Sequence, residues 1–111
     1  MTDATKRLAE LAAMIRDAEL AKLKKLQDVR HRFERDLHGL HTARRDLHAS
    51  AAPDLAHRSG SDGRWLVWAS RQSQLLSLKS ASAAADAEAQ MVKARRALGR
   101  ADVLEKLTRK T

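Results

Sequence analysis

The side chains of this sequence that could hold a metal ion are its five histidines, most of which precede its one proline. His38 and His41 are spaced i, i+3, and Glu34 and Asp46 lie nearby along the chain. A structural zinc site needs three or four converging ligands, which in helical proteins come from different helices. No convergent set is found here. The pattern therefore predicts no metal site, and histidines that only add positive charge below about pH 6.5.

The sequence contains no recognisable catalytic motif. There is no cysteine, which excludes disulfides, cysteine-ligated zinc and thiol catalysis. Phosphate loops, dinucleotide-binding turns, nucleophile elbows and zinc-protease histidine pairs are also missing. The neighbouring carboxylates of Asp86 and Glu88 would point to different sides of a helix. We therefore expect no enzyme, no cofactor and no small-molecule substrate.

The two tryptophans, Trp65 and Trp68, form the most specific signal in the sequence. At a spacing of i, i+3 they would lie on one side of a helix, and an exposed ring is a natural anchor for a protein partner. The alternative is that the hairpin itself covers them. In that case at least one ring would pack against large apolar residues of the preceding helix, namely Phe33, Leu37, Leu40 or Leu47.

Basic residues exceed acidic ones, 22 against 14, for a net charge of +8. This balance leaves nucleic acid, an anionic membrane surface and an acidic protein surface open as partners. The surplus is marked in the C-terminal third, where the candidates for a partner contact are Lys93, Arg95, Arg96 and Arg100. Many of these charges could instead be solvated, with i, i+4 partners such as Asp102 and Lys106.

Helices must position these residues, because apolar side chains recur in steps of three or four along the first half of the chain. The expected row is Leu8, Leu11, Ile15, Ala18, Lys22, Leu26, Val29, Phe33, Leu37, Leu40, Arg44 and Leu47. That spacing is typical of a helix that pairs with another helix. Pro53 and the serine- and glycine-rich residues after it predict a connecting loop. We expect helix one over about 3–50, the loop over about 51–62, and helix two over about 63–109, capped by Ser61 or Asp62.

Helix two has apolar residues on either side of an alanine-rich stretch, which spans 80–89. The expected interface residues are Trp65, Trp68, Leu75, Leu78, Met91, Ala94, Leu98, Ala101, Leu104 and Leu107. These two halves do not share one heptad phase, so we expect a local irregularity between them. The predicted fold class is all-α: a long antiparallel two-helix coiled-coil hairpin, with residues 1–111 in a single domain. No apolar run approaches the roughly 20 residues that cross a bilayer, and we expect a cytoplasmic protein.

A hairpin of two helices has one narrow interface and no third layer. It buries little area for its length. The predicted fold therefore implies protein partners or further copies of the chain.

The run Arg64-Trp65-Leu66-Val67-Trp68 resembles the start of the second helix of FliJ-type proteins, the central-stalk component of the flagellar type III export ATPase. The family pattern is an Arg-Trp pair, a Tyr three residues after the Trp, then a Phe, then a Leu. Arg64, Trp65 and Leu75 fit it, and Trp68 replaces the Tyr with another aromatic residue. Arg71 stands where the Phe is expected, so a contact made through that position does not carry over.

This resemblance implies a coiled coil similar to the stalk of rotary ATPases, whose joined chain ends contact a ring of ATPase subunits. The half near the loop would meet the membrane-embedded export gate or escort chaperones. Transferred by position, Trp65, Trp68 and Leu75 would belong to the gate-facing surface. The basic residues Lys93, Arg95, Arg96 and Arg100 are the candidates, on charge alone, for the ATPase contact. The protein would then work in the cytoplasm, peripheral to the membrane through the export apparatus.

Two alternatives remain open from the sequence. A basic helical protein that binds nucleic acid would explain the net charge, although its aromatic residues are too few and too clustered to stack along a strand. A generic coiled-coil scaffold or escort chaperone would explain the apolar rows. Affinity that falls steeply with salt would mark the first, and a dimer in sedimentation would mark the second.

Overall fold

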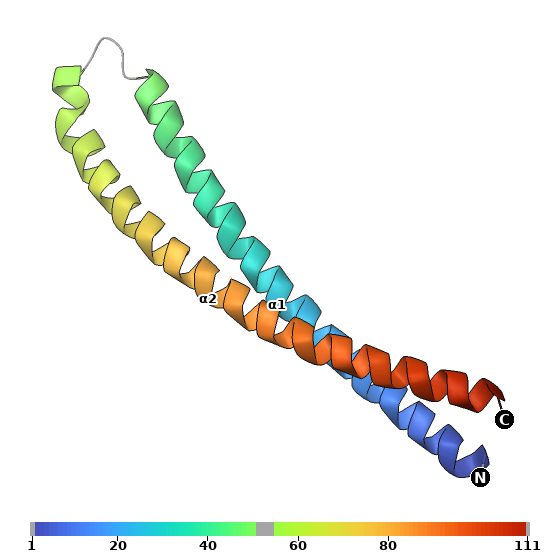
Figure 1. Ribbon diagram of the computed structural model, residues 1–111. Helices are drawn as coiled ribbons and strands as arrows, with labels where there is room; N and C mark the ends of the chain where they lie inside the picture. Colours follow the sequence, from blue (N-terminus) through green and yellow to red (C-terminus); the bar gives the residue numbers. More distant parts are fainter. Residues whose placement is uncertain (1, 51–54, 111) are drawn as a thin grey trace. The chain divides into compact units, whose positions relative to one another are not determined.

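A computed structural model describes residues 2–50 and 55–110, and every one of them is helical (Figure 1). Helix α1 spans Thr2–Ser50 and helix α2 spans Leu55–Lys110. The prediction of an all-α chain made of two helices is confirmed.

The ends of the helices correct part of the sequence interpretation. Helix α1 ends at Ser50, as expected, but α2 begins at Leu55 and not near residue 63. The expected loop was therefore too long, and Ser61 and Asp62 lie inside the helix and do not cap it. Glycine in a helix costs only about 1 kcal/mol relative to alanine, so Gly60 and Gly63 are tolerated there. The remainder of the predicted loop, 51–54, lies outside the described residues.

The chain divides into two compact units, and both helices contribute to each. We call them the terminal unit (2–28 with 84–110) and the central unit (29–50 with 55–83). In the terminal unit, Leu8 shares a groove with Leu104, and Glu19 is bonded to Gln90. In the central unit, the Lys79 ammonium lies 5.9 Å from the Phe33 ring centroid, and His41 Nε2 lies 3.3 Å from Ser73 Oγ. Residue numbers rise along α1 as they fall along α2, so the helices are antiparallel in each unit, as expected for a hairpin.

The interface side of α2 follows one heptad phase. Buried and half-buried positions recur in steps of three and four: Ala69, Ser73, Leu76, Ser80, Ala83, Ala87, Gln90, Ala94, Ala97, Ala101, Leu104 and Thr108. The helix is continuous through the alanine-rich stretch, so the expected irregularity is wrong. The phase was misread because leucines were taken as interface residues. Trp68, Leu75, Leu78, Leu98 and Leu107 were expected in the interface, and all five are exposed.

The interface side of α1 was predicted more accurately in the central unit than in the terminal unit. In the central unit the expected Phe33, Leu37, Leu40 and Leu47 are half-buried, as is Leu26 just before it. In the terminal unit the half-buried row is Thr5, Ala9, Ala12, Arg16, Glu19 and Leu23, and Ala13, Leu26 and Gln27 are half-buried as well. Apart from Leu26, the expected residues there lie one position away from this row, which is about 100° around a helix. Leu8, Leu11 and Ile15 are accordingly 55%, 53% and 48% exposed. The expected Ala18, Lys22, Val29 and Arg44 are exposed as well.

Alanine makes up the apolar core of the described residues. The buried apolar side chains are Ala69, Ala83, Ala87, Ala94, Ala97 and Ala101, and no large side chain in the described part of the chain is fully buried. Small side chains allow two helices to approach closely, because interaxial distance depends on the side chains at the contact. Many of the larger apolar residues, among them Leu8, Leu11, Trp68 and Leu78, are exposed and available to partners.

Candidate protein-binding surfaces

The two tryptophans of the central unit differ in their surroundings. Their ring centroids are 6.3 Å apart with the planes inclined at 44°. Trp65 is half-buried, whereas Trp68 is 51% exposed. Trp68 is therefore the ring that a partner can reach more fully. Packing of Trp65 on the four residues named from the sequence stays a prediction.

Trp68 begins an exposed apolar row on α2 of the central unit. Leu75 and Leu78 continue it at helical spacing and are 44% and 70% exposed. Arg71, also exposed, falls within the same row. Because the buried Ala69 and the half-buried Ser73 and Leu76 define the other side of α2, the row points away from α1. Two of the sequence-predicted site residues, Trp68 and Leu75, thus share one accessible face, and Trp65 does not belong to it.

The four basic candidates of the terminal unit, Lys93, Arg95, Arg96 and Arg100, are all exposed. Among the residues that the structure describes, none of the four forms an ion pair, whereas Lys106 and Arg109 pair with Asp102 and Glu105. The structure does not bring the four together. Arg96 and Arg100 lie on one flank of α2, and Arg95 lies on the other, in a shallow hollow shared with Arg16, Asp102 and Glu105. Lys93 is close enough to Glu19 for its charge to favour the ionised carboxylate.

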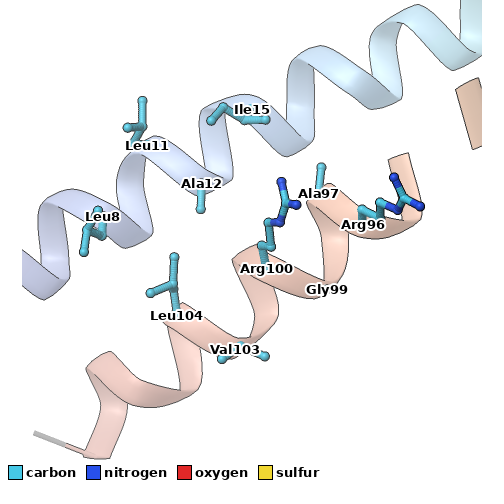
Figure 2. Close-up of a pocket in the computed structure, with 10 residues that line it drawn as sticks. All are labelled: Leu8, Leu11, Ala12, Ile15, Arg96, Ala97, Gly99, Arg100, Val103 and Leu104. Atoms are coloured by element: carbon cyan, nitrogen blue, oxygen red, sulfur yellow. The ribbon is translucent and has the colours of Figure 1, made fainter. Parts of the chain in front are cut away.

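Arg96 and Arg100 border an apolar groove between the two helices of the terminal unit. The groove has a volume of about 550 Å³. Its other lining residues are Leu8, Leu11, Ala12 and Ile15 from α1 and Ala97, Gly99, Val103 and Leu104 from α2. Figure 2 shows these residues on facing stretches of the two helices, with Leu104 and Arg100 extending toward α1. Sequence reasoning missed this site because it placed Leu8, Leu11 and Ile15 inside the interface. The signal that could have found it is the parallel row of alanines, Ala9 and Ala12, one position away.

A polar contact crosses the interface of the terminal unit. Gln90, only 7% exposed, donates from Nε2 to the backbone carbonyl of Glu19 at 3.0 Å and to its carboxylate. The hydrogen bond from Gln90 lowers the pKa of Glu19, with further contributions from Lys22 and Lys93, against desolvation. A buried polar residue at an interface position can fix the register of paired helices, because any other register leaves it unsatisfied.

The central unit has a corresponding charged cluster on its surface. Arg30 Nε donates to Glu34 at 3.0 Å, and the His31 ring lies 3.3 Å from the other carboxylate oxygen. The hydrogen bond from Arg30, followed by that from His31, lowers the pKa of Glu34. Unlike the Gln90 contact, this cluster lies within one helix and does not join α1 to α2.

Within the described ranges, no group of three or more histidine or acidic side chains is placed to hold a metal ion. A search of the same residues finds no helix apolar enough over a sufficient length to cross a membrane.

Comparison with known proteins found no matching family model, no matching curated protein and no matching solved structure.

Proposed function

We propose that this chain is a non-enzymatic helical hairpin of the bacterial flagellar type III export apparatus, which binds and regulates the export ATPase and contacts the export gate or escort chaperones. One observation carries the protein-binding part of the proposal. Both units leave large apolar side chains exposed, whereas the fully buried apolar side chains among the described residues are all alanines. The resemblance of the Arg64–Trp68 run to FliJ-type proteins carries the assignment to flagellar export.

The gate-facing contact is assigned to the exposed row of α2 in the central unit. Trp68, Leu75 and Leu78 offer an aromatic ring and two aliphatic side chains on one face. Aromatic residues dominate the energy of protein interfaces because they bury a large area with few rotatable bonds. Arg71 lies within this face. The partner surface must therefore accept a cation at the position where FliJ-type proteins have a phenylalanine.

The ATPase contact is assigned to the basic residues of the terminal unit. Lys93, Arg95, Arg96 and Arg100 lack ion pairs among the described residues and are free to meet an acidic protein surface. Charged pairs of this kind accelerate association more than they deepen affinity, and salt weakens them. We therefore expect the rate of association with the ATPase to fall as ionic strength rises.

The test is binding of the purified chain to the cognate export gate protein and export ATPase, measured by calorimetry. Trp68→Ala should weaken gate binding at least about tenfold, as expected for an aromatic anchor, and should leave ATPase binding unchanged. Leu98→Ala is the matched control, because Leu98 is similarly exposed but belongs to the terminal unit. Gate binding that is undiminished in both Trp68→Ala and the Trp65→Ala/Trp68→Ala double variant would remove the site assignment.

The net charge of +8 calls for a second measurement, with nucleic acid. A gel-shift titration of duplex DNA and of single-stranded RNA at two salt concentrations should show only weak binding. Tight binding that falls by several decades as salt rises, the mark of many phosphate contacts, would favour a nucleic-acid-binding role over the export role.

A further inference from the structure

We propose that the apolar groove of the terminal unit is a docking site for one helix of a partner protein, amphipathic and acidic along its edges. The inference rests on the proposed function only in that the chain acts by binding proteins. It names the chemistry of a partner at this groove, whether or not that partner belongs to the flagellum.

The lining of the groove has the pattern that receives a helix. Leu8, Leu11 and Ile15 are spaced in steps of three and four along α1, and the facing residues of α2 span a similar number of turns. Two packed antiparallel helices present ridges on either side of the groove between them, and a third helix fits by placing its own apolar ridge there. The occupant should therefore carry apolar anchors at i, i+3 or i+4, and i+7.

Leu8, Leu11 and Ile15 do not form the covered row of α1 in this unit. The half-buried positions of α1 in this unit include Ala9 and Ala12, while Leu8, Leu11 and Ile15 remain about half exposed. A contiguous exposed apolar patch on a protein commonly marks an interaction site. The row is therefore better explained by an external partner than by the stability of the hairpin.

The positive charge at the edge of the groove indicates that the partner helix is acidic. Arg96 and Arg100 lie one turn apart at the edge of the groove, and no ion pair is found for either among the described residues. Glutamate or aspartate side chains at the edges of an incoming helix could pair with both. A second copy of this chain is disfavoured, because it would bring a net charge of +8 and the same two arginines. The occupant is therefore an acidic helix from another protein.

The test uses the full chain and a fluorescein-labelled synthetic helical peptide of about three heptads, with leucines on one face and glutamates along both edges. Fluorescence anisotropy should show saturable binding to the unmodified chain. Reversing both charges, Arg96→Glu with Arg100→Glu, should weaken binding at least about tenfold. The same double variant should gain affinity for a second peptide in which every glutamate is replaced by lysine. Lys24→Glu with Lys25→Glu is the matched control, since both lysines are exposed in the same unit but do not line the groove, and it should change affinity less than about twofold.

Leu11→Ser tests the apolar part independently of charge. It should also weaken binding about tenfold or more, while far-UV circular dichroism shows unchanged helicity because Leu11 is half exposed. Three results would overturn the proposal: equal losses in the Lys24→Glu/Lys25→Glu control and in the Arg96→Glu/Arg100→Glu variant, no effect of Leu11→Ser, or no saturable binding at all. Sedimentation showing a dimer that Leu11→Ser dissociates would assign the groove to a second copy. Failure of the export ATPase to bind would contradict the proposed function and leave these peptide results standing.

Discussion

The terminal and central units use the same heptad spacing but fill it with side chains of different size. In the terminal unit the interface is made of small and polar residues, with Ala9 and Ala12 on α1 and Ala94, Ala97 and Ala101 on α2. In the central unit α1 contributes Phe33, Leu37, Leu40 and Leu47. On α1, Leu8, Leu11 and Leu20 of the terminal unit are consequently exposed, whereas Leu37, Leu40 and Leu47 of the central unit are half-buried. A heptad of apolar residues therefore indicates a paired helix but does not identify which side of that helix is covered.

The largest expected effect comes from removing the aromatic residue of the central interface. Phe33→Ala should lower the free energy of unfolding by about 2 to 3 kcal/mol, which is below the range for a fully buried ring because Phe33 is half-buried. Leu11 belongs to the exposed apolar row of the terminal unit, so Leu11→Ala should lower the free energy of unfolding by less than about 1 kcal/mol. Urea unfolding followed by circular dichroism measures both. Equal losses would mean that Leu11 also belongs to the interface.

Enlarging an alanine of the terminal interface should have the next largest effect. Ala97 is 4% exposed, and Ala97→Leu would overpack the contact between the helices, costing about 1 to 3 kcal/mol. Ala85→Leu provides the control, because Ala85 lies on the exposed side of the same helix. If Ala97→Leu instead raises the thermal midpoint, the terminal helices are not closely packed and the contrast between the units is wrong.

Two glycines allow a matched comparison of helix stability in the two units. Gly39 in the central unit and Gly99 in the terminal unit are both helical, and a Cβ at either position would meet no atom within 4 Å. Gly39→Ala and Gly99→Ala should each stabilise the protein by about 0.5 to 1 kcal/mol, since alanine is the better helix former. Thermal unfolding with each single variant tests this. A destabilised Gly99→Ala variant would show that the groove is more crowded than its geometry indicates.

The smallest expected effect is a loss of stability at acid pH, which can be measured separately for the Glu19 contact of the terminal unit and the Glu34 cluster of the central unit. The pKa values of Glu19 and Glu34 are both lowered in the folded chain. Each therefore stabilises the fold above its unfolded pKa, near 4.5, and loses that contribution as the pH falls below it through the folded value. Gln90→Leu should remove the part due to Glu19, and Arg30→Gln should reduce the part due to Glu34. In thermal midpoints measured from pH 7 to pH 3, the difference between Arg30→Gln and the wild type should vanish toward the acid end. The difference for Gln90→Leu should shrink and then level off, because Gln90 also donates to the backbone carbonyl of Glu19 at every pH. Curves that stay parallel would contradict the assignment.

Much of the fold could be predicted because its signals are local. Steps of three and four between apolar residues required two helices, and the proline at position 53 placed the end of the first near Ser50. The start of the second helix could not be predicted in the same way. Serine and glycine between residues 59 and 63 favour a loop only weakly, and the helix extends through them to Leu55.

The candidate sites could be predicted only in part. Trp68 and Leu75 were singled out from the sequence and lie on one accessible face. Trp65 could not be separated from Trp68, because a spacing of three residues puts both rings on one side of a helix. Arg95 and Arg96 are about 100° apart around the helix, but only the position of the interface decides which of them borders the groove. The groove of the terminal unit was missed, since its lining comes from two segments far apart in the sequence and the alanines one position away were not taken as the covered row.

The sequence by itself determined that this protein is helical, that it folds back once, and that it carries a surplus of positive charge. Only the tertiary structure decided which rows of side chains face each other. Local spacing specifies a helix and its apolar side to within a residue or so. The choice between alanine and leucine as the covered row depends on how closely the second helix approaches, which is a property of both helices together. That choice left Leu8, Leu11 and Ile15 exposed beside Arg96 and Arg100, and so created the groove.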